Sequence, residues 1–179
     1  VSGTSISFGS EVVFESAATS HCAAVYDSTN GKVVIGYRDD GNSYYGTAVV
    51  GTVSGTSISF GSATVFEQGN VNPLSVAYDS SNGKVVFAYQ DGNNSSYGTA
   101  VVGTVSGTSI SFGTPVVFES ANVEHVAATF DSTAGVNKVV IAYYDGGNSN
   151  YGTAIVGTVS GTSISFGDPL VYNSANTSD

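Results

Sequence analysis

The alternation of apolar and polar residues predicts a chain built from β-strands. Residues 57–60 alternate Ser with Ile and Phe, which is typical of a strand with one face in water. Residues 33–37 and 48–51 are apolar or Gly at every position, which is typical of strands covered on both faces. No helical spacing of apolar residues competes with this pattern. The sequence therefore predicts an all-β fold.

One nine-residue sequence recurs four times along the chain. Val-Ser-Gly-Thr-Ser-Ile-Ser-Phe-Gly begins at Val1, Val53, Val105 and Val159. Such a period predicts a tandem repeat, with a partial unit followed by three full units. The two additional residues of the third unit fall within residues 132–137, which predicts an exposed turn that tolerates insertion. The single repeat domain at residues 1–179 is thus divided into residues 1–20, 21–72, 73–124 and 125–179.

Turn residues divide each full unit into four predicted strands. In and just after the first unit these strands cover residues 21–26, 32–38, 45–53 and 57–66. Asn30-Gly31 between the first two supplies the positive φ of a tight hairpin turn. Gly61 interrupts the fourth strand, where a bulge or bend is expected. The short connections predict an antiparallel meander in each unit.

Meanders with covered inner strands and a solvated outer strand are typical of β-propeller blades. Gly36, Ala88 and Ala142, at one position of the second strand, would let neighbouring sheets approach closely. A β-trefoil closed by three repeats is the alternative, because propellers have about 4–8 blades and three would leave apolar faces open. Residues 1–14 supply a further outer strand, which predicts either a longer array or pairing with another copy, in a filament or a six-bladed ring.

The charge balance excludes several classes of partner. The 179 residues include 14 acidic and 4 basic side chains, for a net charge of −10. This composition predicts no binding to nucleic acid or to anionic membranes. No apolar run reaches the roughly 18 residues of a membrane span. The chain starts without Met or a signal peptide, so we expect a processed chain or a piece of a longer one.

The loops after the second strand of each unit carry the candidate binding chemistry. They contain Asp, Asn, Gly and Ser at residues 39–43, 91–95 and 145–149. These residue types favour tight turns, but their oxygens also suit Ca²⁺ or a polar ligand. Tyr37, Tyr89 and Tyr143 beside the loops are interpreted as packing between sheets, with stacking on sugars as the alternative. The candidate ligand-binding residues are Arg38, Asp39, Asn42, Gln90, Asp91, Asn94, Tyr144, Asp145 and Asn148.

No residue is assigned to catalysis or to a metal. His21 and His125 occupy equivalent positions, but Pro73 stands between them in the second unit, which argues against a symmetric zinc site. No Gly-x-Ser-x-Gly nucleophile motif occurs, and no cofactor is predicted. Cys22 lies beside Ala23 and is predicted to be a buried, structural thiol.

Three sequences carry a resemblance to a known group of proteins. They are Tyr26-Asp-Ser-Thr-Asn-Gly-Lys-Val-Val-Ile, Asp39-Asp-Gly-Asn-Ser and Tyr45-Gly-Thr-Ala-Val-Val-Gly-Thr-Val-Ser-Gly-Thr-Ser-Ile-Ser-Phe-Gly. The chain resembles tandem β-repeat proteins of marine phages and uncultured aquatic microbes, which look like tail fibres or adhesins. The resemblance implies attachment or structural work outside the cell or on the virion surface.

The sequence thus favours a non-enzymatic structural or adhesive protein that builds a fibre or appendage. Its expected partners are further copies of itself, joined through the terminal strand and the blade faces, and surface glycans. The alternative is a lectin-like, glycan-binding propeller module formed by oligomerisation.

Overall fold

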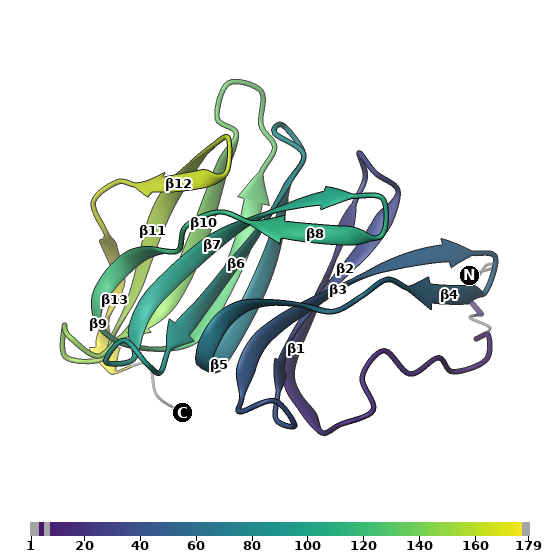
Figure 1. Cartoon of the computed structure of the whole chain (residues 1–179). Helices are drawn as coiled ribbons and strands as arrows, with labels where there is room; N and C mark the ends of the chain where they lie inside the picture. Colours follow the sequence, from purple (N-terminus) through teal and green to yellow (C-terminus); the bar gives the residue numbers. More distant parts are fainter. Residues whose placement is uncertain (1–3, 6–7, 177–179) are drawn as a thin grey trace.

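The fold is all-β, as predicted. The computed structural model describes residues 4, 5 and 8–176, and its regular elements are thirteen antiparallel strands in one open sheet (Figure 1). The described part of the chain contains no helix that is long and apolar enough to cross a membrane. The strands are β1 (Thr19–Asp27), β2 (Lys32–Asp39), β3 (Tyr45–Ser54), β4 (Ser57–Phe60), β5 (Thr64–Asp79), β6 (Lys84–Asp91), β7 (Tyr97–Ser106), β8 (Ser109–Phe112), β9 (Val116–Asp131), β10 (Lys138–Asp145), β11 (Tyr151–Ser160), β12 (Ser163–Phe166) and β13 (Leu170–Asn176).

Each unit forms the antiparallel meander that the turn residues predict. In the first unit β2 pairs with β1 and β3, and β3 pairs with β4 and the start of β5. The first turn forms because the Asp27 carboxylate accepts the backbone N–H groups of Thr29 and Asn30, while Gly31 adopts a φ of 64°. The turn at residues 132–137 of the third unit is exposed over most of its length, as predicted from its two additional residues.

The fourth strand of a unit does not end where the sequence predicts. We expected a separate outer strand that ends at Phe66, but β5 runs on to Asp79 without a turn. Its first half pairs with β3 of the first unit, and its second half pairs with β6 of the second unit. The physical reason is that the two halves pair with different strands, so the chain passes from one unit to the next without a hairpin. β9 joins the second and third units in the same way, so residues 72 and 124 lie inside strands.

The bulge expected at Gly61 is confirmed. Gly51 lies opposite Phe60, and Ala48 lies opposite Thr64. Two residues of β3 therefore face three residues, 61–63, between β4 and β5. The Gly61 N–H donates a hydrogen bond to the Val50 carbonyl at 2.9 Å, which holds the bulge against β3.

The core consists of two clusters of apolar side chains, one at each junction between successive units. β6 and β7 of the second unit are buried on both faces, which confirms the prediction from their apolar sequences. The expected close approach occurs at Gly36, where an added Cβ would lie 2.8 Å from the Phe87 ring of the next unit. The units are therefore held together by their faces as well as by the shared strands β5 and β9.

The sheet is open at both ends. Among the described strands β1 pairs only with β2, and the strands of the first unit do not pair with those of the third. The three repeats therefore do not close on themselves as a β-trefoil would. The arrangement of the units as propeller blades stays a proposal.

A glycine contact repeated at each junction gives the first prediction. An added Cβ at Gly113 would lie 1.8 Å from the Thr162 carbonyl oxygen, at the tip of the next unit's hairpin. No unit packs over the equivalent Gly167 in the described structure, and the nearest atom to a Cβ added there would be 3.9 Å away. Gly113→Ala should therefore lower the free energy of unfolding by about 2–3 kcal/mol through overpacking, whereas Gly167→Ala leaves it within about 0.5 kcal/mol. Urea denaturation of both variants measures this, and equal losses would contradict the packing described.

Candidate functional site

The main candidate site is the pair of open faces at the two ends of the sheet. Every junction joins two different faces, one from each of the units that meet there. We call the face of the first unit that turns away from the second the head face, and the opposite face of the third unit the tail face. The head face includes Cys22, Ile35 and Val53, whereas the tail face includes Val140, Ala142, Ala154 and Val156.

The tail face exposes apolar side chains that are buried wherever another unit follows. Val156 is 46% exposed, while the equivalent Val102 and Val50 are 1% and 0% exposed. Ala142 is half-buried in the third unit, but the equivalent Ala88 is fully buried in the second. The residue type is the same at each of these positions and only the exposure differs. The absence of a covering unit is therefore the cause of the exposure.

The head face shows the same difference at the other end of the sheet. Val53 is 54% exposed, while Val105 and Val159, at the same position, are each 6% exposed. Ile35 is half-buried, whereas the equivalent Phe87 is fully buried. The chain thus presents two faces that are each matched by the opposite face of a neighbouring unit at its internal junctions.

A repeated set of ring contacts and hydrogen bonds locks each internal junction. Phe66 from the outer strand of the first unit packs against Tyr89 and Phe112 of the second, with ring centroids 5.4 and 5.6 Å away. The Tyr89 hydroxyl donates a hydrogen bond of 3.1 Å to Glu67. The second junction repeats this with Phe118, Glu119, Tyr143 and Phe166. The prediction that these tyrosines serve packing is confirmed.

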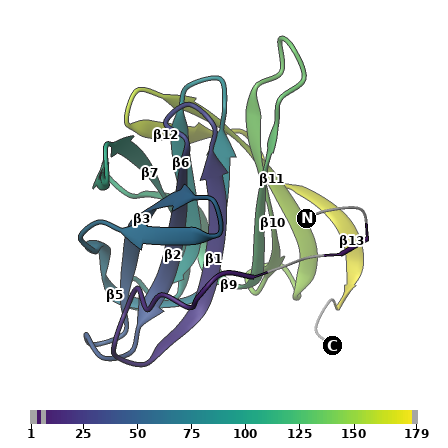
Figure 2. The ribbon, with the colours of Figure 1, turned by 90° about the vertical axis from the view of Figure 1, so that its right-hand side faces the viewer.

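The N-terminal segment lies on the head face in the place of an outer strand. Phe14 packs against Tyr37 and Phe60, with centroids 5.1 and 5.8 Å apart, and Tyr37 donates to Glu15 at 3.5 Å. Residues 8–18 belong to no strand, and Figure 2, which looks onto the first unit, shows them in purple on the outside of the sheet. The head face is therefore partly covered by a segment that belongs to no strand.

Titration of the junction glutamates gives a second prediction. Burial raises the pKa of Glu67 and Glu119 above the ordinary 4.5, and the nearby Asp91 and Asp145 carboxylates raise it further. The folded state thus holds these protons more tightly than the unfolded state, so the free energy of unfolding falls as pH rises from about 4.5 through the raised pKa values.

Glu67→Gln with Glu119→Gln keeps an acceptor for each tyrosine hydroxyl and removes the charge. The double variant should match the wild type near pH 4 and be more stable at pH 7 to 8, as measured by urea denaturation at each pH. Glu11→Gln, at an exposed position, is the control. A wild-type advantage at pH 8 would contradict the burial argument.

The predicted loop aspartates are buried, and two of them hold their own turns through their carboxylates. Asp39, Asp91 and Asp145 are all buried. The Asp91 carboxylate accepts the backbone N–H groups of Asn93 and Asn94, and the Asp145 carboxylate accepts that of Gly147. Asn42, Asn94 and Asn148 are exposed at equivalent positions, where the backbone of each closes the turn onto the preceding aspartate. The asparagine side chains are thus the accessible part of the predicted ligand-binding set.

The variable residues before these loops lie at or near the junctions. Arg38 forms a 2.7 Å ion pair with Asp40 and donates to Asn70, at the end of the outer strand. The Arg38 hydrogen bond holds the pKa of Asp40 below its usual value. Gln90 donates to Asn122 and to the Val123 carbonyl in the next shared strand. Tyr144, at the same position of the third unit, is half-buried. This placement links their variation to contacts between units.

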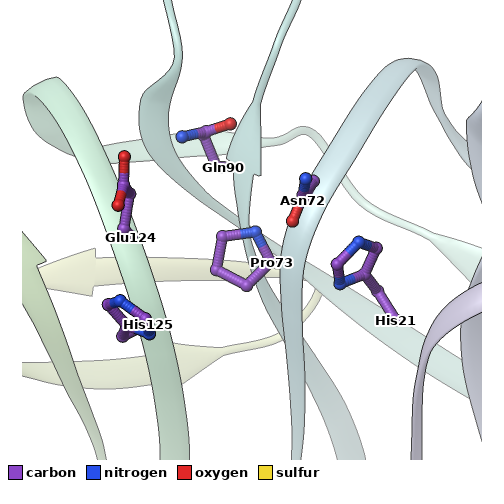
Figure 3. A pocket seen from close by; sticks show the side chains of 6 residues that line it. All are labelled: His21, Asn72, Pro73, Gln90, Glu124 and His125. Atoms are coloured by element: carbon purple, nitrogen blue, oxygen red, sulfur yellow. The ribbon is translucent and has the colours of Figure 1, made fainter. Parts of the chain in front are cut away.

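A polar pocket lies between the first strands of the three units, which are β1 and the second halves of β5 and β9. Its volume is about 520 Å³. The pairing of each first strand is irregular at this point. His21 and His125 adopt positive φ values of 49° and 50°, and the Asn72-Pro73 peptide bond is cis. Pro73 lies between the two histidines (Figure 3). Burial lowers the pKa of His21, and the Arg38 charge lowers it further. The pocket is lined by His21, Asn72, Pro73, Gln90, Glu124 and His125.

This pocket could not be predicted from local sequence, because the residues that line it come from four separate stretches of the chain. The bulge that turns each histidine depends on strand register, which composition does not reveal. Only the equivalent positions of His21 and His125 were visible in the sequence.

The prediction that Cys22 is buried is wrong. Its thiol is free and exposed. The equivalent Leu74 and Val126 are buried because each faces the unit before it, whereas Cys22 lies on the head face. Burial at this position therefore depends on a neighbouring unit, which the local sequence does not show.

Comparison of the chain with protein-family models, with curated proteins and with solved structures finds no match. The resemblance to phage and microbial repeat proteins therefore stays a prediction.

Proposed function

We propose that the chain is a non-enzymatic structural protein that associates head to tail through its two open faces. The observation that carries this proposal is the exposure of Val53 and Val156, whose equivalents are buried at both internal junctions. Exposed apolar side chains whose equivalents are buried between units are expected at a surface that binds another unit. A second copy supplies the face that fits each end.

Polar contacts across the junctions support the same pairing. The Tyr78 hydroxyl of the second unit donates to the Thr29 hydroxyl of the first at 2.6 Å. The equivalent Tyr26 of the first unit is exposed, and Thr133 of the third unit is exposed at the position of Thr29. A second copy placed in the internal register brings Tyr26 to Thr133. The ends of the chain therefore carry matching partners for a hydrogen bond as well as matching apolar surfaces.

Joining two different faces leads to a fibre or to a closed ring. Heterologous contacts generate open filaments unless the rotation between copies closes. We propose a fibre or appendage outside the cell or on a virion surface, in keeping with the acidic composition and the predicted resemblance. A net charge of −10 keeps such a protein soluble and disfavours nucleic acid and anionic membranes as partners.

The single cysteine provides a direct test of this function. Cys22 lies on the head face, so association should bury its thiol as Leu74 and Val126 are buried. We expect labelling by a maleimide to slow by about tenfold or more as protein concentration rises through the association range, because the thiol then reacts only from the dissociated fraction. Labelling in urea controls for intrinsic reactivity. A labelling rate constant independent of protein concentration would overturn the proposal.

A lectin-like propeller module is the second candidate, and the polar pocket favours it. Its volume of about 520 Å³ falls in the range of small-molecule sites. Its imidazole, amide and carboxylate groups can exchange hydrogen bonds with sugar hydroxyls. Saturable binding of a soluble oligosaccharide that is lost in His125→Ala supports this candidate, whereas no binding across a broad glycan panel counts against it.

A further inference from the structure

We propose that copies join by strand exchange, in which residues 12–15 of one copy replace Leu170 to Asn173 of β13 on strand β11 of the preceding copy. This inference rests on the proposed head-to-tail association. It identifies residues 12–15 as the segment that pairs with β11 at the joint. In the free chain β13 occupies that position.

Two segments of the chain compete for one position at such a joint. In each internal junction a single outer strand lies between the two units, namely the first half of β5 or of β9. When two copies meet, β13 of one copy and residues 12–15 of the other both correspond to that strand. β13 pairs with β11 in the free chain, and residues 12–15 lie on the head face at the opposite end of the sheet (Figure 1). Only one of them can occupy the joint.

The sequence of the N-terminal segment is the one that the internal junction uses. Residues 12–17 read Val-Val-Phe-Glu-Ser-Ala, and residues 116–121 are identical. The latter begin β9 and pair with β7. β11 differs from β7 only by Ile155 in place of Val101. Strand exchange therefore rebuilds, between two copies, the pairing that already joins the second and third units.

The side chains of β13 fit the joint less well. Tyr172 and Asn173 stand where the internal junctions have Phe and Glu. Tyr172 is 61% exposed, and the side chain of Asn173 is one methylene shorter than that of Glu, with its Oδ1 accepting the backbone N–H of Ala175. Phe14 and Glu15 already contact Tyr37 on the head face. Because the shorter Asn173 side chain already accepts a local hydrogen bond while Glu15 accepts one from Tyr37, residues 12–15 are the better occupant.

The path of the chain favours the same outcome. In β5 and β9 the outer strand of one unit runs without a break into the first strand of the next. Residues 12–18 lead into β1 in the same manner, and their backbone lies outside the described strands. Exchange gives this backbone the partners that β13 gives up, so the number of backbone hydrogen bonds to β11 is conserved.

The decisive experiment links β13 to β11 with an engineered disulfide, which we call a staple. Thr153 pairs with Val171, so cysteines at these positions lie within the range of a disulfide. Thr153→Cys with Val171→Cys, made with Cys22→Ser, should associate when reduced and lose association by at least about tenfold when oxidised. Thr99→Cys with Val117→Cys places the same staple at the internal junction and is the matched control, since it should associate equally in both states. Sedimentation velocity measures association in each case.

The outcomes separate this inference from the function on which it rests. If the oxidised Thr153–Val171 staple associates as strongly as its reduced form, strand exchange is wrong and the head-to-tail function stands. If no reduced protein associates, the proposed function is wrong, and strand exchange with it. A second variant, Val13→Cys with Thr153→Cys, should form a disulfide between chains on oxidation, because residue 13 then takes the place of Val171.

Discussion

Val156→Asp should abolish association of the chain while the single copy stays folded. Val156 is exposed on the tail face, so the aspartate remains in water until a second copy covers it. Burial of its unpaired carboxylate then opposes association by several kcal/mol, which corresponds to a loss of affinity of about a hundredfold or more. Sedimentation velocity compares this variant with the wild type, and circular dichroism checks the fold.

The matched control places the same charge inside the chain. Val102 occupies the position of Val156 in the second unit and is fully buried against the third. Val102→Asp should therefore lower the free energy of unfolding by about 3–5 kcal/mol. If Val156→Asp associated like the wild type, the tail face would not be the site of contact.

Phe66→Ala should be the most damaging truncation at the junction of the first and second units. Its ring is buried and contacts Phe87, Tyr89 and Phe112. Removal of a buried aromatic ring of this kind costs about 3–5 kcal/mol, since the cavity has no side chain to fill it. Urea denaturation gives the value.

Tyr172→Ala provides the comparison, because Tyr172 occupies the same position in the third unit and is exposed. Its loss should change the free energy of unfolding by no more than about 0.5–1 kcal/mol. Equal losses of free energy of unfolding in Phe66→Ala and Tyr172→Ala would contradict this account. They would show that the stabilisation by the ring does not depend on the unit that covers it.

Much of the fold follows from local sequence. The ends of β1 and β2 at their shared turn agree to within two residues, because Asp27, Asn30 and Gly31 form this turn through their own side chains and backbone. The interruption at Gly61 follows from a glycine within a strand. These features depend on a few neighbouring residues, which is why the sequence predicts them.

Other features depend on residues that are distant in the sequence. The continuity of β5 across two units arises because its halves pair with different strands, β3 and β6, which lie on either side of it in the chain. The exposure of Cys22 depends on whether another unit precedes the first. The predicted loop aspartates proved to be buried, and the carboxylates of Asp91 and Asp145 accept backbone N–H groups of their own loops. Ligand binding at the exposed asparagines stays a prediction.

The proposed association uses surfaces that the repeat already contains. Successive units bury one face against the opposite face of the next, and the same sequence pattern continues to both ends. A face that is apolar at every internal junction is apolar at the ends as well. The proposed association therefore needs no surface beyond those that already stabilise the single chain.

Electron microscopy of the purified chain over a wide range of concentration tests the central claim most directly. The account predicts that three-unit particles give way, as concentration rises, to longer filaments or closed rings in which the spacing of units across each joint equals the spacing within a chain. Separate three-unit particles at the highest concentration, or particles joined side by side with both end faces open, would contradict it.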